Sequence, residues 1–133
     1  MNNFTINLNQ LKPGMVALVG VPSDENSSFL RGPAQAPGQI RQVLHSGSSN
    51  MCAENGHDLS AETRLLDVGD LPLGPDIWQA NGSPTITNQI ASLLEKGARV
   101  LSLGGDHAVT FPIVKAFAAK YPDLTILHID AHP

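Results

Sequence analysis

The sequence is short of charge, and this shortage is unusual for a protein of its size. Only 15% of its 133 residues are charged, against about 25% in an ordinary soluble domain. Because a small domain has proportionally more surface than a large one, it should carry more charge rather than less. The low charge therefore predicts either that part of the surface is covered by something else or that the chain belongs to a larger body.

Basic clusters, long apolar runs and paired cysteines are also missing. The chain has 8 basic and 12 acidic residues, a net charge of −4 and no Lys/Arg cluster, so we expect no nucleic-acid or anionic-membrane partner. No apolar run approaches the ~20 residues that span a bilayer, and residues 1–10 lack the features of a signal peptide. The single Cys52 cannot form an internal disulfide, which favours a reducing compartment. These absences predict a soluble, cytoplasmic protein.

What the sequence does contain is an alternation of apolar runs and helix signals. The continuous apolar character of the runs favours strands that are buried on both faces of a sheet. Proline fits a first helical turn and a short polar side chain caps one, so Pro37, Ser83–Pro84 and Asp106 are typical helix starts. The expected strands are 15–22, 64–69, 99–103 and 124–130, and the expected helices are 37–47, 84–97 and 106–120.

This order of elements predicts right-handed strand–helix–strand units, and hence an α/β protein with a parallel sheet. Ligands of such sheets bind at the carboxyl ends of the strands. The chemistry is therefore expected in two places above all: Gly104–His107, after the third strand, and Asp130–His132, after the fourth.

The first of these segments, Gly104-Gly105-Asp106-His107, has two interpretations. The glycines permit a tight turn and a close backbone approach, as in a phosphate cradle. However, the pattern lacks the Gly-Lys-Ser/Thr of a P-loop and the spaced glycines of a dinucleotide fingerprint, and Asp106 would repel phosphate. Turn chemistry alone favours a connection in which Asp106 caps the following helix and His107 is simply a residue at its start.

The second segment, Asp130-Ala131-His132, places a carboxylate and an imidazole on one face, since residues i and i+2 of a strand point the same way. The pair could hold a metal, could be an Asp that orients a His, or could be a polar cluster at a strand end. If the two strand ends are neighbours, His107, Asp130 and His132 share one edge. These donors suit Mn²⁺, Fe²⁺ or Zn²⁺ better than Mg²⁺ or Ca²⁺, although three ligands are too few for two ions.

The other candidate side chains have plainer interpretations. His128 shares the face of Asp130, and we expect it to pack in the sheet or to hydrogen-bond a ligand of the metal. Cys52 has no basic neighbour that would lower its pKa, which favours an inert thiol. His45 and His57 lie in polar stretches and are expected at the surface, and Trp78 is expected to be a packing anchor.

Four landmarks follow one another in the order seen in a known family. They are the first strand and its loop and helix (Gly20–Asp24, Ser27–Pro33 and Ala36–Arg41), Asp67-Val-Gly-Asp70, Gly104-Gly-Asp-His107 and His128-Ile-Asp-Ala-His132. Together they resemble the ureohydrolase superfamily of arginases, agmatinases, guanidinobutyrases, proclavaminate amidinohydrolases and formiminoglutamases. The opening loop looks most like the agmatinase-like branch.

The resemblance implies a three-layer α/β/α sandwich around a parallel sheet, with residues 1–133 as the N-terminal part of a single domain that holds about the first four strands. It implies a site for two Mn²⁺ ions in which His107 binds one ion, His132 the other, and Asp130 bridges or neighbours both. A metal-activated water would attack the carbon of a small cationic guanidino or amidine substrate and release urea, or formamide in formiminoglutamases. The intact protein would be a homo-oligomer.

The sequence departs from the family pattern at its end. The family's next ligand Asp, its later Asp-x-Asp pair, its proton-shuttling His and its substrate-facing carboxylate all lie beyond Pro133, and its eight-stranded sheet separates the third strand from the fourth. The leading expectation is therefore a hydrolase fragment that is inactive alone. The alternatives are a non-catalytic pseudoenzyme or assembly fragment that needs a partner chain, and a flavodoxin-like phosphate or nucleotide binder that uses Gly104-Gly105.

Overall fold

The fold is organised around three parallel strands in the computed structural model, which describes residues 8–47 and 50–131. Strand β1 (Val16–Gly20) lies in the middle, with β2 (Leu65–Asp70) on one side and β3 (Arg99–Leu103) on the other. The pairing of β1 with β2 shifts register between Leu18 and Val19. All three strands therefore end at one edge of the sheet, as the strand–helix–strand order predicts.

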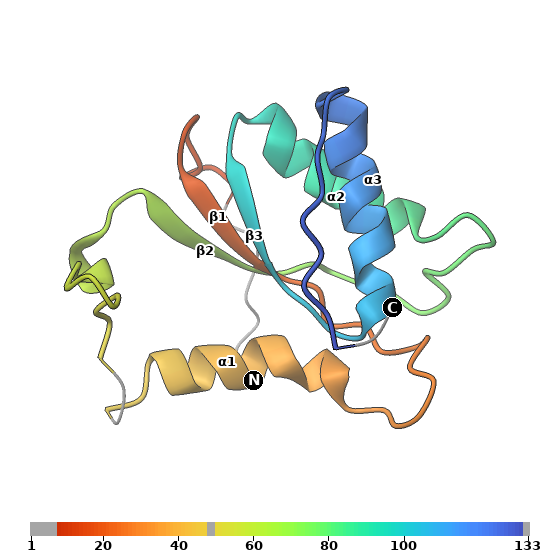
Figure 1. Cartoon of the computed structure of the whole chain (residues 1–133), viewed down its shortest axis with the longest axis horizontal. Coiled ribbons are helices and arrows are strands. Elements are labelled where there is room, and N and C mark those ends of the chain that lie inside the picture. The colour runs from red at the N-terminus through yellow and green to blue at the C-terminus, as the bar shows by residue number, and fades with distance from the viewer. Residues whose placement is uncertain (1–7, 48–49, 132–133) are drawn as a thin grey trace.

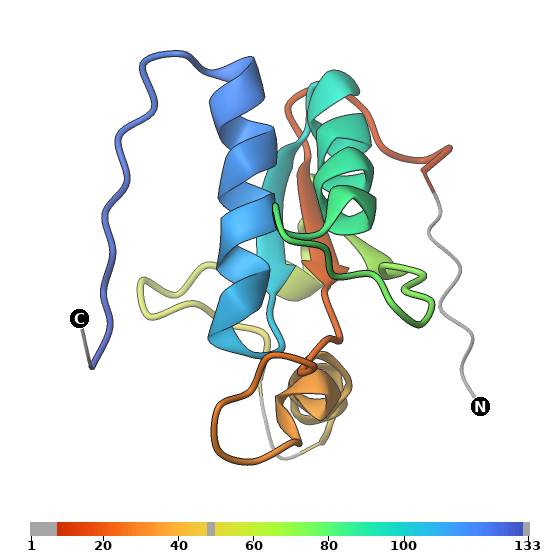
Figure 2. The same cartoon turned by 90° about the vertical axis from the view of Figure 1, so that its right-hand side faces the viewer.

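Three helices cover the two faces of this sheet. Helices α2 (Pro84–Glu95) and α3 (Thr110–Lys120) lie side by side on one face, and α1 (Ala36–Leu44) lies on the other (Figures 1 and 2). The start of α2 follows the sequence prediction, because the hydroxyl of Ser83 accepts a hydrogen bond from the Ile86 amide at 3.3 Å. The arrangement is a three-layer α/β/α sandwich, as the sequence predicts.

The main core fills the space between the sheet and α2 with α3. Alternate residues of β1 point into it, and the inner side chains of α2 are almost completely buried. Each such Leu or Ile contributes about 1.5–3 kcal/mol by leaving water. The hydrophobic residues of this core cluster with 1% exposure or less are Ala17, Val19, Val21, Val68, Ile86, Ile90, Leu93 and Leu94.

Ion pairs hold helix α1 on the opposite face of the sheet. Arg41 is 3% exposed and donates two hydrogen bonds to Asp67, at 2.7 and 3.0 Å, and a further one to Asp70. Burial disfavours the charge of this guanidinium, but the two carboxylates outweigh burial and raise the pKa of Arg41. The close approach also requires glycine on β1, since a Cβ at Gly20 would meet the Asp70 carboxylate at 1.8 Å.

The expected fourth strand does not form in the described part of the chain. Residues 124–130 have no strand partner but run back beside α3, in front of it in the view of Figure 1. Ile126, Leu127 and Ile129 are 59%, 86% and 87% exposed. An apolar run predicts an extended backbone, but a strand also needs a neighbour to pair with, and the run has none here.

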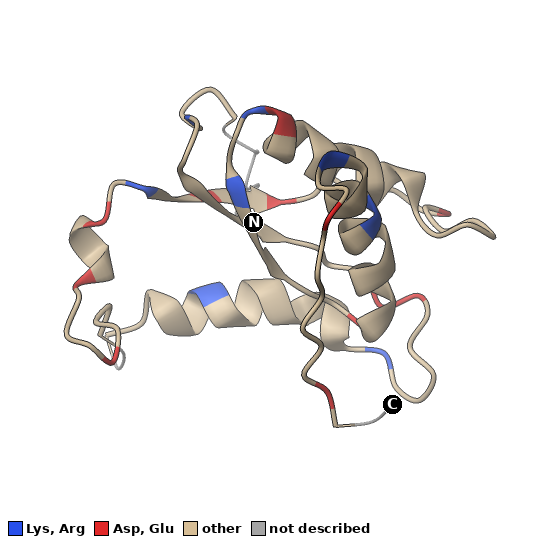
Figure 3. Cartoon of the chain, turned by 45° about the horizontal axis from the view of Figure 1, so that its top comes forward, with Lys and Arg blue, Asp and Glu red and all other residues tan. Residues whose placement is uncertain are grey.

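The connection to α3 also differs in detail from the prediction. The 3₁₀ turn His107–Val109 precedes the helix proper, which begins at Thr110. None of the helices among residues 8–47 and 50–131 is long and apolar enough to cross a bilayer. Lys and Arg are scattered singly over the described chain (Figure 3), in agreement with the absence of a basic cluster in the sequence.

Candidate metal centre

The turn after β3 is packed against the loop after β1, backbone to backbone. The Asp106 amide donates a hydrogen bond to the Ser23 carbonyl at 2.9 Å. A Cβ at Gly105 would stand 1.8 Å from that carbonyl oxygen, so no other residue fits at this position without moving the chain. Gly105 therefore serves a close contact between two strand ends.

Asp106 joins the two segments with its side chain as well. It is 8% exposed; one carboxylate oxygen accepts from the Ala108 amide at 3.0 Å, and the other accepts from the Asn26 amide at 3.0 Å and the Ser27 hydroxyl at 3.5 Å. Asp106 is a cap as predicted, but of the 3₁₀ turn His107–Val109 rather than of α3, whose N-cap is Val109. The carboxylate of Asp106 already uses these donors. The turn therefore offers a phosphate neither these amides nor an uncharged surface.

His107 follows directly, and its imidazole meets the C-terminal segment. Its Nδ1 lies 3.1 Å from Oδ2 of Asp130, and Nε2 of His128 lies 3.4 Å from the same oxygen. The two imidazole rings are 5.3 Å apart between centroids and tilted by 56°. Two segments more than 20 residues apart in the chain thus place three possible metal donors around one point.

The structure brings His107 and Asp130 together as the sequence predicts, although residues 124–130 form no strand. His132, the third predicted ligand, lies outside the described residues. For His128, the expected packing in the sheet is wrong, because its side chain is 54% exposed. The other expectation, a contact with a ligand of the metal, agrees with the structure, since Nε2 of His128 lies 3.4 Å from Oδ2 of Asp130. The spacing of two residues between His128 and Asp130 predicts this contact, since it puts both side chains on one face of an extended segment.

A hollow of about 420 Å³ adjoins His107. Its walls are the turn 105–108 and the loop after β1, including Asn26–Leu30 and Pro33. Asp24 shapes this loop, since its carboxylate accepts from the amides of Gly32 at 2.7 Å and Ala34 at 3.2 Å. These two hydrogen bonds lower the pKa of Asp24. They tie the loop to itself, whereas Asp106 holds it against the turn that carries His107 through Asn26 and Ser27.

The donor set fits a divalent transition ion. The candidate ligand atoms of His107, His128 and Asp130 all lie within 4.8 Å of one another. Imidazole and carboxylate together suit Mn²⁺, Fe²⁺ or Zn²⁺, and three protein ligands leave coordination positions free for water or substrate, as in catalytic rather than structural sites. The arrangement can therefore hold an ion beside a hollow large enough for a small molecule.

The remaining candidates lie away from this centre. Trp78 donates from its indole to the Ser23 hydroxyl at 3.0 Å and packs against the core, so its predicted role as an anchor is confirmed. His45 and His57 are exposed as predicted, and His57 pairs with Glu62 at 3.3 Å. Cys52 is a free, exposed cysteine.

Known proteins share both the sequence and the fold. The model of the arginase family matches residues 15–133. The mitochondrial arginase 1 of Arabidopsis thaliana is 40% identical over 123 residues, which cover 88% of this chain and 36% of the plant protein. The agmatinase of Bacillus subtilis (strain 168) is 37% identical over 115 residues, which cover 86% of this chain and 39% of the bacterial one.

The solved structure of arginase from Medicago truncatula is similar with a TM-score of 0.70 at 32% identity, over 90% of this chain and 39% of that one. The chain thus spans a little more than a third of the length of the relatives that it matches. The family match includes all three strands and the segment that carries Asp130. The chain belongs to the arginase family.

Proposed function

We propose that this chain carries part of the active centre of a ureohydrolase, which uses two Mn²⁺ ions to hydrolyse a C–N bond of a small cationic guanidino or amidine compound with release of urea. The observation that carries the proposal is the convergence of His107 and Asp130, at 3.1 Å, beside the hollow under the loop after β1. Membership of the arginase family supports the same chemistry. The net charge of −4 favours a cationic substrate.

Each residue has a separate task in this proposal. His107 would hold one ion through Nδ1, His132 would hold the other, and Asp130 would stand between them. Bound Mn²⁺ supplies a hydroxide at neutral pH by lowering the pKa of a shared water. Asp106 fixes the backbone on which His107 stands, because its carboxylate ties that turn to Asn26.

The described residues offer three donors, and a centre with two ions takes more. We therefore propose that the 133 residues alone bind Mn²⁺ weakly and release no urea, and that an intact protein with the complete centre is a homo-oligomer. The free, exposed Cys52 supports a cytoplasmic location, since a reducing compartment keeps such thiols free.

A chimera tests the proposal. Residues 15–131 replace the matching segment of the Bacillus subtilis agmatinase, and urea release from agmatine is measured with Mn²⁺. We expect turnover by the chimera, loss of most of it in the His107→Ala variant, and no change in the matched variant His57→Ala, which alters an exposed imidazole outside the site. The 133-residue chain should release no urea from agmatine, arginine or guanidinobutyrate.

Two results would contradict the proposal. A chimera that folds and holds two Mn²⁺ ions but releases no urea would favour a non-catalytic member of the family. Turnover by the isolated 133-residue chain would overturn the statement that it is inactive alone.

A further inference from the structure

We propose that His128 is itself a metal ligand, so that His107, His128 and Asp130 form a three-donor site for a single divalent transition ion in this chain. The inference rests on the proposed metal centre and adds a ligand to it. It assigns His128 a direct bond to the ion in place of a role in packing or in hydrogen-bonding a ligand.

The distances carry the argument. Metal bonds of about 2.1 Å to imidazole and carboxylate place neighbouring donors roughly 3.0–3.4 Å apart around the ion. Oδ2 of Asp130 lies 3.1 Å from Nδ1 of His107 and 3.4 Å from Nε2 of His128. These two donor pairs therefore have the spacing of a coordination sphere, and the donor atoms of all three residues lie within 4.8 Å of one another.

The backbone explains why these three side chains meet. His107 is fixed at the start of its 3₁₀ turn, since Asp106 caps that turn and binds the loop after β1. His128 and Asp130 are two residues apart on an extended segment and so point the same way. Both imidazoles are more than half exposed, 57% for His107 and 54% for His128, which leaves an ion open to water.

Two imidazoles and one carboxylate also define the class of ion. Imidazole nitrogen favours Zn²⁺, Co²⁺ and Ni²⁺ over Mg²⁺ and Ca²⁺, which prefer oxygen donors. A site with one imidazole for each ion would suit Mn²⁺, so the addition of His128 shifts preference toward metals later in the Irving–Williams order. The proposed site thus binds Co²⁺ or Zn²⁺ more tightly than Mn²⁺.

Cobalt reports both the affinity and the ligands. The chelator-treated 133-residue chain is titrated with Co²⁺ by calorimetry and by visible absorption, and proton NMR counts the hyperfine-shifted imidazole N–H signals. We expect one equivalent of Co²⁺ and two such signals, from His107 and His128. His128→Ala should remove one signal and weaken binding tenfold or more, since loss of even an indirect partner of a metal costs 10–100-fold.

The controls separate this inference from its alternatives. His107→Ala and Asp130→Asn should weaken binding like His128→Ala, His57→Ala should change nothing, and far-UV circular dichroism verifies that each variant is folded. If His128→Ala binds Co²⁺ like the parent while His132→Ala loses a signal and affinity, His128 is not a ligand and the inference fails, although the centre proposed above survives. A folded parent chain that binds no Co²⁺ also overturns it.

Discussion

Asp106 shows how a single carboxylate can hold a functional turn in place. Its two oxygens serve different segments, the 3₁₀ turn that bears His107 and the loop that walls the adjoining hollow. The residue is buried and charged, and it is satisfied only because both segments aim amides at it. Asp106, which binds no ion itself, therefore fixes the position of His107.

Replacing Asp106 by Ala tests this role. The change removes a helical cap, which costs about 1 kcal/mol, and leaves the Asn26 amide without its partner, which costs about 1–3 kcal/mol more. We expect the free energy of unfolding, measured by urea denaturation, to fall by roughly 2–4 kcal/mol. Asp106→Asn retains one acceptor and should fall between the parent and Asp106→Ala.

The matched control is Asp58→Ala. Asp58 caps an exposed 3₁₀ turn, Leu59–Ala61, by accepting from the Ser60 amide at 2.8 Å, and the hydrogen bonds of its carboxylate among the described residues go to Ser60, two residues away. Its loss should destabilise the chain less than the loss of Asp106. Equal effects from the two substitutions would show that the contact with the loop after β1 contributes nothing.

At the scale of elements, local signals predict helices and buried strands, whereas strand partners need information from elsewhere. The Ser83 cap places the start of α2 correctly, and continuous apolar runs place β1 and β3. Residues 124–130 have the same apolar character, yet they remain unpaired because pairing depends on a neighbouring edge. The site shows the same limit. The sequence predicts that His107 and Asp130 meet and that His128 shares the face of Asp130, but it predicts a strand at 124–130, and the path that this segment takes instead depends on the rest of the molecule.

Helix α1 depends on charge where α2 depends on apolar burial. The side chain of Arg41 reaches from α1 to the end of β2, where it forms ion pairs with Asp67 and Asp70. Removing one partner of a buried ion pair costs about 3–5 kcal/mol, since the other partners are left uncompensated. Arg41→Met preserves the apolar stem, and we expect it to lower the free energy of unfolding by that amount, as measured by urea denaturation.

Arg64→Met serves as the matched control for Arg41→Met. Arg64 also binds a carboxylate through two nitrogens, on Glu62, but its side chain is 74% exposed. Exposed pairs of this kind add little to stability, so this variant should unfold like the parent. An Arg41→Met chain as stable as Arg64→Met would mean that packing alone holds α1 on the sheet.

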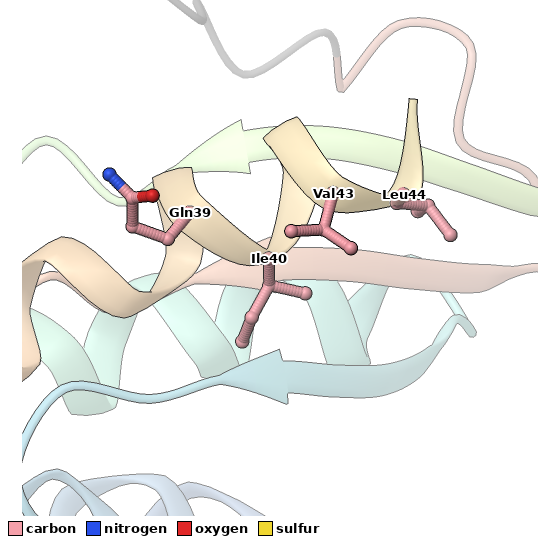
Figure 4. Close-up of a pocket in the computed structure, with 4 residues that line it drawn as sticks. All are labelled: Gln39, Ile40, Val43 and Leu44. Atoms are coloured by element: carbon pink, nitrogen blue, oxygen red, sulfur yellow. The ribbon is translucent and has the colours of Figure 1, made fainter. Parts of the chain in front are cut away.

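At the scale of the whole molecule, the shortage of charge in the sequence reappears as exposed apolar surface. The described surface exposes large apolar side chains on several elements, where a small soluble domain usually places charge. On α1, Gln39, Ile40, Val43 and Leu44 line an open hollow of about 390 Å³ (Figure 4). Ile40 and Val43 are 45% and 61% exposed there, and Leu101 of β3 is 52% exposed. The low charge of the sequence and the exposed apolar area therefore describe the same surface.

This surface predicts that the 133-residue chain associates with itself as its concentration rises. Contiguous apolar surface in contact with water favours association, with a free-energy gain of about 25 cal/mol for each Å² that becomes buried. Light scattering over a concentration series should show a rising mean mass for the parent chain.

Val43→Lys places a charge in the centre of the α1 hollow and should move this rise to higher concentration. Gln42→Lys adds the same charge on the same helix, at an exposed position outside the hollow, and should change the mass far less. A parent chain that stays monomeric throughout, or two variants that behave alike, would show that the apolar face of α1 does not drive association.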